Sequence, residues 1–118
     1  MSAEFFLNTK PNTSWAYENQ IMIEAILRGL DTYRGFSKSY DSYVLVDTAV
    51  LWSEERSKSG KVIPNVYFHF NNEILMLMIN SLSVEITIDI DKFIKEVQHH
   101  TDVIIVDDDD ELLSWNDI

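Results

Sequence analysis

The sequence contains no cysteine and only three glycines. Without cysteine, the chain has no disulfide, no thiolate nucleophile and no thiolate metal ligand. The glycines, Gly29, Gly35 and Gly60, are too isolated for a dinucleotide-binding fingerprint, a phosphate-binding loop or a glycine-framed nucleophile elbow. The enzyme classes that depend on those motifs are therefore excluded.

Long hydrophobic runs are also missing. The longest, Ile74–Ile79, has the length of a strand and falls far short of the roughly 20 residues that cross a bilayer. The first ten residues contain Phe5, Phe6 and Leu7 but neither a preceding basic region nor a cleavage-like group of small residues, so we expect no signal peptide. A length of 118 residues, a hydrophobic content of 46% and a mean hydropathy of −0.10 predict one soluble globular domain, residues 1–118.

Positive charge is scarce. The chain has 9 lysines and arginines against 20 acidic residues, for a net charge of −11. Residues 102–118 contain seven of the acids and no base, so this stretch carries −7 and the first 101 residues carry −4. Such a chain repels nucleic acid and anionic membranes and attracts a basic protein, and we expect a partner of that last kind.

The stretch 62–90 has the clearest pattern, and we predict three successive strands within it. Residues 61–70, 73–79 and 83–90 are separated by the turn-forming pairs Asn71-Asn72 and Asn80-Ser81. In the last strand, apolar residues alternate with polar ones: Val84, Ile86, Ile88 and Ile90 against Ser83, Glu85, Thr87 and Asp89. This alternation predicts a half-buried strand. Residues 75–79 are apolar on both faces, which predicts a central strand covered on both sides or facing a partner.

Further strands are expected on either side of this stretch. We predict a long strand over residues 43–52 and a short one over residues 103–106, for which a preceding helix permits parallel pairing. Residues 31–42 and 53–60 are expected to be loops. The apolar residues Phe5 and Phe6 are expected to form a short edge strand.

Helical periodicity marks two segments. Residues 14–28 carry an apolar stripe at helical spacing, with Ser14 as a cap and Gly29 as a left-handed stop. We predict a second helix over residues 92–100, with Asp91 as its cap. The chain is thus predicted to be α+β, with a mainly antiparallel sheet of about four to five strands packed against an N-terminal and a C-terminal helix.

Catalytic and metal-binding patterns are weak. The adjacent His99 and His100 diverge by about 100° on a helix and rarely share one metal ion. The acidic run at residues 107–111 lacks the alternating ligands and central glycine of a calcium loop. His69 could act as a general base, but no nucleophile or orienting residue lies near it in the sequence. We therefore expect a protein that is not an enzyme and holds no metal or cofactor, with a small enzyme using His69 as a remaining alternative.

The acidic C-terminal segment, residues 107–118, permits two interpretations. It can be a solvated tail that maintains solubility, or a docking surface for a basic partner. Docking is favoured because the run follows an apolar strand and precedes Leu112, Leu113 and Trp115, which can serve as anchors. We take as candidate partner-binding residues Asp107, Asp108, Asp109, Asp110, Glu111, Trp115, Trp52, Glu54 and Glu55.

In size, acidity and the mixing of acids with aromatic residues, the chain resembles the small immunity proteins of contact-dependent growth inhibition systems and nuclease colicins. The residues that carry this resemblance are Trp52, Glu54, Glu55, the run 107–111 and Trp115. The resemblance implies a cytoplasmic, cofactor-free inhibitor that binds a basic nuclease-type toxin, and we expect a monomer.

An alternative of a different class is a phage nucleic-acid mimic that blocks a host restriction or CRISPR nuclease. A mimic needs acids spaced like phosphates along an extended surface. Here the charge is concentrated at one end of the sequence, which favours the immunity interpretation.

Overall fold

An antiparallel sheet forms the base of the fold. The computed structural model describes residues 3–107 and 112–113. In chain order the elements are β1 (Ala3–Lys10), α1 (Trp15–Glu18), α2 (Gln20–Arg28), β2 (Tyr33–Ser37), β3 (Ser42–Leu45), α3 (Glu54–Lys58), β4 (Val66–Asn71), β5 (Ile74–Ile79), α4 (Val84–Gln98), β6 (Asp102–Asp107) and β7 (Leu112–Leu113). The described strands form one sheet in the order β2-β3-β4-β5-β1-β6-β7, with every neighbouring pair antiparallel. The predicted α+β class with a mainly antiparallel sheet is confirmed, and the sheet is wider than expected.

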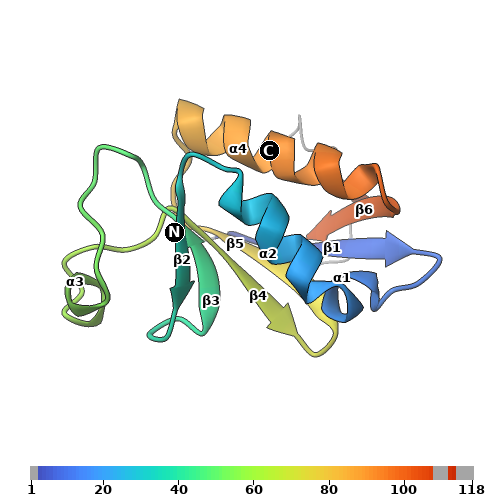
Figure 1. The fold of residues 1–118 in the computed structure, drawn as a ribbon, viewed down its shortest axis with the longest axis horizontal. Coiled ribbons are helices and arrows are strands. Elements are labelled where there is room, and N and C mark those ends of the chain that lie inside the picture. Colours follow the sequence, from blue (N-terminus) through green and yellow to red (C-terminus); the bar gives the residue numbers. More distant parts are fainter. Residues whose placement is uncertain (1–2, 108–111, 114–118) are drawn as a thin grey trace.

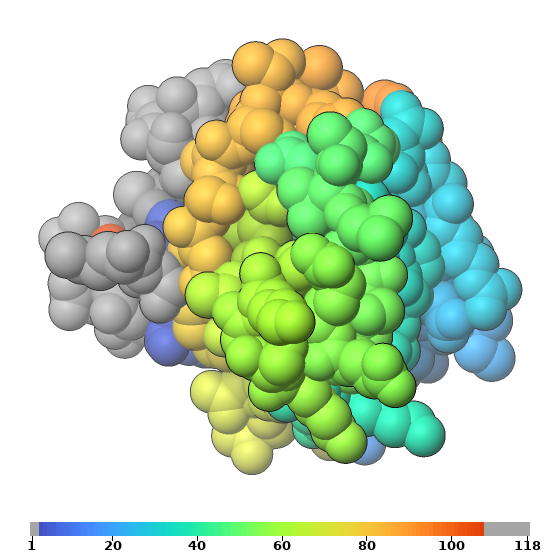
Figure 2. Space-filling model, turned by 90° about the vertical axis from the view of Figure 1, so that its left-hand side faces the viewer, coloured from blue at the N-terminus to red at the C-terminus, as the bar shows by residue number. Residues whose placement is uncertain are grey.

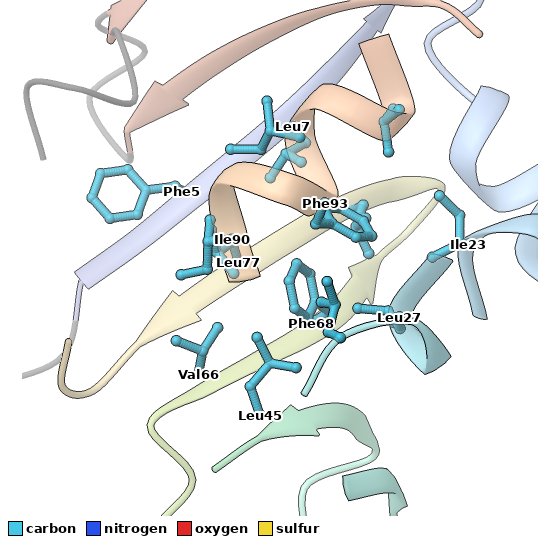
Figure 3. Close-up of a cluster of buried hydrophobic side chains, with 14 of the residues drawn as sticks. Phe5, Leu7, Ile23, Leu27, Leu45, Val66, Phe68, Leu77, Ile90 and Phe93 are labelled. Carbon is cyan, nitrogen blue, oxygen red and sulfur yellow. The ribbon is translucent and has the colours of Figure 1, made fainter. Parts of the chain in front are cut away.

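Helices α1, α2 and α4 all lie on one face of this sheet (Figure 1). The core fills the space between the two layers (Figure 3). At its centre the ring of Phe68 on β4 meets the ring of Phe93 on α4 with centroids 4.7 Å apart. Other fully buried side chains from both layers surround this pair: Ile23, Leu27, Leu45, Val66, Leu77 and Ile90. Burial of this kind stabilises a domain by roughly 1.5–3 kcal/mol for each large side chain.

The strand predicted for residues 83–90 is wrong, because these residues begin helix α4. Ser83, not Asp91, caps the helix, its hydroxyl accepting a hydrogen bond from the Ile86 amide at 3.2 Å. The buried positions recur at helical spacing and extend through the segment predicted separately as residues 92–100: Ile86, Ile90, Phe93, Ile94 and Val97. Ile86 and Ile90, every second apolar residue of the alternating pattern, also share one face of a helix. Val84 and Ile88 lie off that face and are exposed.

Asp89, expected on the wet side of that strand, is instead buried. Its carboxylate accepts hydrogen bonds from the Thr32 amide at 2.9 Å and the Thr32 hydroxyl at 2.6 Å. A buried carboxylate needs such donors to offset its lost hydration. The contact fixes the chain just before β2 against α4.

Strand β1 is internal, which corrects the prediction of an edge strand at Phe5 and Phe6. It lies between β5 and β6, so that Phe5 is opposite Leu77 on one side and Asp107 on the other. Because both neighbours are antiparallel to β1, strands β5 and β6 run in the same direction and helix α4 connects them. The parallel pairing considered for residues 103–106 is not formed, because among the described strands β6 pairs with β1 and β7 and both pairings are antiparallel.

Several other elements differ from the predicted ones in their bounds or their caps. The strand predicted over residues 43–52 ends at Leu45, and the loop predicted over residues 31–42 contains β2. The loop predicted over residues 53–60 contains the short helix α3, capped by the Ser53 hydroxyl. The first helix is interrupted at Asn19, and the Ser14 side chain donates to Glu73 instead of capping it. Gly29 has φ −79°, so the left-handed stop is also wrong.

The second sheet face bears no helix among the described residues (Figure 1). On β5, Leu75, Leu77 and Ile79 are buried towards the helices, whereas Met76 on the opposite face is half-buried. Residues 75–79 thus belong to an internal strand, as predicted, but no described helix covers its second face, where Met78 is nevertheless buried. Within the described residues, no helix is both long and apolar enough to cross a membrane.

Candidate partner-binding surface

The longest connection between neighbouring strands is the loop of residues 46–65, which joins β3 to β4 and contains α3. It extends from one end of the sheet (Figure 1), and Figure 2 views the molecule from that end. Connections of this length are uncommon in small domains and are often functional. We call its exposed surface, together with the start of α4, the loop-end surface.

A polar junction of four residues fixes both ends of this loop. Asn65 accepts a hydrogen bond from the Asp47 amide at 3.0 Å and donates to the Asp47 carboxylate at 3.1 Å and the Ser81 hydroxyl at 2.9 Å. The second oxygen of Asp47 accepts from the hydroxyl of Ser83, the residue that caps α4. The junction of Asp47, Asn65, Ser81 and Ser83 thus connects the loop to β4 and α4.

Two further contacts hold the first half of the loop. The Thr48 amide donates to a Glu85 carboxylate oxygen at 2.6 Å, and the Thr48 hydroxyl lies 3.0 Å from the other oxygen. The Arg34 guanidinium on β2 donates to the carbonyls of Asp47 at 2.8 Å and Val50 at 3.1 Å. The loop backbone is therefore fixed to α4 on one side and to β2 on the other.

Exposed apolar side chains concentrate on this fixed backbone. Among the described residues nine large hydrophobic side chains are exposed, and six belong to the loop-end surface: Val50, Leu51, Ile63, Leu82, Val84 and Ile88. Leu51 is 72% and Val84 is 79% exposed. Figure 2 shows the loop (green) and the start of α4 (orange) side by side on this face. Single exposed apolar residues are common, but their concentration in one place is typical of an interaction surface.

The register of the sheet brings the start of the acidic segment to the same end. Leu45 at the end of β3, Val66 at the start of β4 and Ile79 at the end of β5 are linked through the ladders. On β1, Ala3 is opposite Ile79, and Asp107 on β6 is opposite Phe5, two residues further along. The structure thus places Asp107 at the end of the sheet from which the loop also extends.

The other predicted site residues divide into three groups. Trp52 is half-buried and Glu55 is exposed, both on the loop. Glu54 accepts hydrogen bonds from the Lys38 amide at 3.1 Å and the Ser39 hydroxyl at 2.9 Å, so it tethers α3 to the turn between β2 and β3. Asp108, Asp109, Asp110, Glu111 and Trp115 lie outside the described residues.

The Glu54 tether affects the ionisation of that carboxyl. Partial burial opposes ionisation, but the hydrogen bonds from Ser39 and the Lys38 amide outweigh this effect and hold the pKa of Glu54 below its usual value. Glu54 is therefore ionised at neutral pH and engaged within the chain, which leaves Glu55 as the acid of this pair that faces solvent.

The loop itself is electrically balanced. Asp47, Glu54 and Glu55 are matched by three bases, Arg56, Lys58 and Lys61. The net negative charge at this end must therefore come from outside the loop. Among the described acids outside the loop, Asp107 lies at this same end of the sheet.

Four of the six exposed apolar residues, Ile63, Leu82, Val84 and Ile88, fall within the stretch from which the three strands were predicted. Val84 and Ile88 were missed because the alternating pattern placed both on the buried side of a strand. A signal was available, since Val84 and Ile88 lie off the helical stripe that joins Ile86 and Ile90 to Phe93 and Val97.

The contacts of His69 Nδ1 do not activate the neighbouring Ser42 hydroxyl as a nucleophile. Its Nδ1 lies 2.9 Å from the Asp41 carbonyl oxygen and 3.5 Å from the Ser42 hydroxyl. A carbonyl can only accept, so Nδ1 carries the proton and cannot receive one from Ser42, whose hydroxyl donates to the Tyr40 carbonyl at 2.8 Å. In the part of the chain that the structure describes, no group of three or more histidines and carboxylates is arranged to hold a metal ion.

Comparison with known proteins assigns no relative. No family model, curated protein or solved structure matches the chain.

Proposed function

We propose that this protein is an immunity-type inhibitor that binds and neutralises a basic, nuclease-type toxin in the cytoplasm. The observation that supports this most is the meeting of two features at one end of the sheet. There the exposed apolar residues of the loop-end surface lie at the same end as Asp107, where the acidic segment begins. Apolar anchors surrounded by charge are typical of tight protein interfaces.

Each feature has its own role in this proposal. A nuclease active site is positive because it holds phosphates, so the −11 charge of the chain accelerates encounter with such a protein. Leu51, Val84 and Ile88 then lose water at the interface and slow dissociation. Trp52 and Glu55 border this contact. The inhibitor acts as a monomer and uses no metal or cofactor.

The nucleic-acid mimic has less support. A mimic presents an uninterrupted series of acids, whereas in the loop of residues 46–65 Arg56, Lys58 and Lys61 stand among the acids. Exposed leucine, valine and isoleucine side chains also have no counterpart in a phosphate backbone. Both features favour a partner with its own apolar surface.

The direct test uses a basic nuclease domain encoded next to this gene. Equimolar protein should abolish nucleic-acid cleavage by that domain, and calorimetry should give a one-to-one complex. The complex should weaken as salt rises, because exposed charges are screened. Full nuclease activity at saturating protein would refute the proposal. Inhibition of several unrelated DNA-binding proteins would instead support the mimic.

A further inference from the structure

A small hollow lined by aromatic rings lies at the opposite end of β3 and β4 from the loop of residues 46–65. It has a volume of about 250 Å³ and is bounded by the turn between β2 and β3, the end of β4, and the helices α1 and α2. We call it the aromatic hollow. The side chains that matter here are Tyr17, Phe36, Asp41, Tyr43, His69 and Phe70.

Five phenylalanine and tyrosine rings line this hollow, and four of them form two edge-to-face pairs. Tyr17 meets Phe70 with ring centroids 5.7 Å apart and an interplanar angle of 87°, and Phe36 meets Tyr43 at 5.3 Å and 75°. Tyr17 and Phe36 are also two of the three large exposed hydrophobic side chains that lie outside the loop-end surface. Aromatic faces carry negative electrostatic potential, so a group of rings open to solvent favours a cation.

The acidic residue Asp41 also lines the hollow. Asp41 has φ 50°, a left-handed conformation that aspartate and asparagine tolerate better than most residues. Its carbonyl accepts the hydrogen bond from His69 Nδ1, which fixes the turn. Within the described residues the Asp41 carboxylate has no hydrogen-bond or ion-pair partner, and none of the chain's lysines or arginines lines the hollow.

The aromatic lining keeps its uncharged form. Burial, and after it the negative charge of Glu24, raises the pKa of the Tyr43 phenol. The Tyr43 ring therefore stays neutral at physiological pH and retains its aromatic face for a cation. The hollow thus combines neutral aromatic rings with an acidic residue.

We infer that the aromatic hollow receives the guanidinium group of an arginine side chain from a basic polypeptide. A volume of about 250 Å³ is below the roughly 300–1,000 Å³ of sites for drug-sized molecules and suits a single side chain. A guanidinium group is planar, so it stacks on aromatic faces and pairs with a carboxylate, which a compact ammonium group does less well. The choice of a polypeptide as the source of the cation rests on the proposed function, whereas affinity for a guanidinium group does not.

The first test titrates the full chain with N-acetyl-arginine amide and, separately, with N-acetyl-citrulline amide, followed by NMR. Citrulline has nearly the same shape but no charge. We expect the arginine probe to shift the ring resonances of Tyr17, Phe36 and Tyr43 and to bind at least about tenfold more tightly than citrulline, about 1.4 kcal/mol. Equal affinities, or shifts confined to other parts of the molecule, would overturn the inference.

Two variants locate the binding. Asp41→Asn removes the charge and keeps a residue that tolerates the left-handed conformation, and Phe36→Leu removes a ring that is largely exposed. Each should weaken arginine binding by about fivefold to tenfold. The control Asp102→Asn makes the same charge change on β6, across the sheet, and should change affinity less than about twofold.

The outcomes separate this inference from the proposed function. If the arginine probe binds the hollow but no basic nuclease is inhibited, the site stands and the proposed function fails. If a nuclease is inhibited equally well by Asp41→Asn and Phe36→Leu, the proposed function stands and the polypeptide occupant is overturned. Tighter binding of tetramethylammonium than of the arginine probe would also overturn it, in favour of a small quaternary amine.

Discussion

The loop-end surface and the aromatic hollow occupy opposite ends of β3 and β4. Together they account for eight of the nine large hydrophobic side chains that are exposed among the described residues, and Ile21 is the remaining one. They differ in how the backbone beneath them is fixed. The loop-end surface depends on side chains that bond across long sequence distances, such as Asn65 to Ser81 and Thr48 to Glu85. The hollow depends mainly on aromatic rings packed against one another, and a single hydrogen bond from His69 to the Asp41 carbonyl fixes its turn.

This comparison shows that exposed apolar side chains can lie on a backbone that is firmly held by hydrogen bonds. At the loop end, polar side chains turn inward to hold the backbone, while the apolar side chains of the same segment face solvent. The usual arrangement of polar residues outside and apolar residues inside is locally reversed. In the hollow, the same rings both stabilise the site and form its surface.

The largest expected effect comes from breaking the polar junction. Asn65→Ala removes three part-buried side-chain hydrogen bonds, so the free energy of unfolding should fall by about 3 kcal/mol. Urea denaturation measures this change. The matched control is Asn8→Ala on β1, whose side chain makes no hydrogen bond within the described residues, and it should cost less than about 1 kcal/mol. Equal costs for the two variants would show that the junction does not fix the loop.

The next effect concerns partner binding and leaves the backbone intact. Truncating Leu51 and Val84 together to alanine should weaken the complex with the cognate toxin by roughly 30-fold, about 2 kcal/mol, with unfolding almost unchanged because both are exposed. Ile21→Ala provides the control, since Ile21 is 88% exposed and belongs to neither region. Calorimetry of toxin binding by the wild type, the double variant and Ile21→Ala measures these differences in affinity. A loss for Ile21→Ala as large as for the double variant would move the interface to α2.

The smallest effect separates two adjacent acids. Glu54→Gln and Glu55→Gln make the same change in charge, but only Glu54 tethers α3 to the turn between β2 and β3. Glu54→Gln should lower the free energy of unfolding by about 1 kcal/mol and speed hydrogen exchange in α3, whereas Glu55→Gln should affect neither.

The pH dependence of the same pair sharpens this contrast. Because the pKa of Glu54 is lowered in the folded protein, its contribution is present above the ordinary glutamate pKa of about 4.3 and is lost as pH falls through the lowered value. Unfolding measured from neutral to acidic pH should therefore show the wild type and Glu54→Gln converging at low pH. A gap that persists in acid would assign the effect to packing instead of charge.

Much of the fold could be predicted from the sequence, and its main failure has a physical cause. Strands β4 and β5, helix α2 and strand β6 follow from local patterns and turn residues. Residues 83–90 were misassigned because a spacing of four residues, as between Ile86 and Ile90, satisfies both a strand period of two and a helix period of 3.6. Only the capping hydroxyl of Ser83 and the continuation to Phe93 and Val97 distinguish them.

The candidate surface could be predicted only in part. Charge indicated the segment that starts at Asp107, and local composition indicated Trp52 and Glu55. The sequence could not indicate that Glu54 is engaged by Ser39, or that Glu85 at the start of α4 bonds to Thr48 of the loop, because both depend on contacts between distant segments. The aromatic hollow was missed for the same reason, since α1, β2, β3 and β4 each contribute to it.

The central position of β1 in the sheet has a consequence for co-translational folding. This strand is synthesised before its two ladder partners, β5 and β6, which lie far behind it in the sequence. Contacts so distant in sequence close late and slow the folding of a domain. Until β6 emerges from the ribosome, one hydrogen-bonding edge of β1 has no partner strand. A nascent chain stalled at that stage would expose the unpaired edge at Phe6 and Leu7, which could pair with other chains and aggregate.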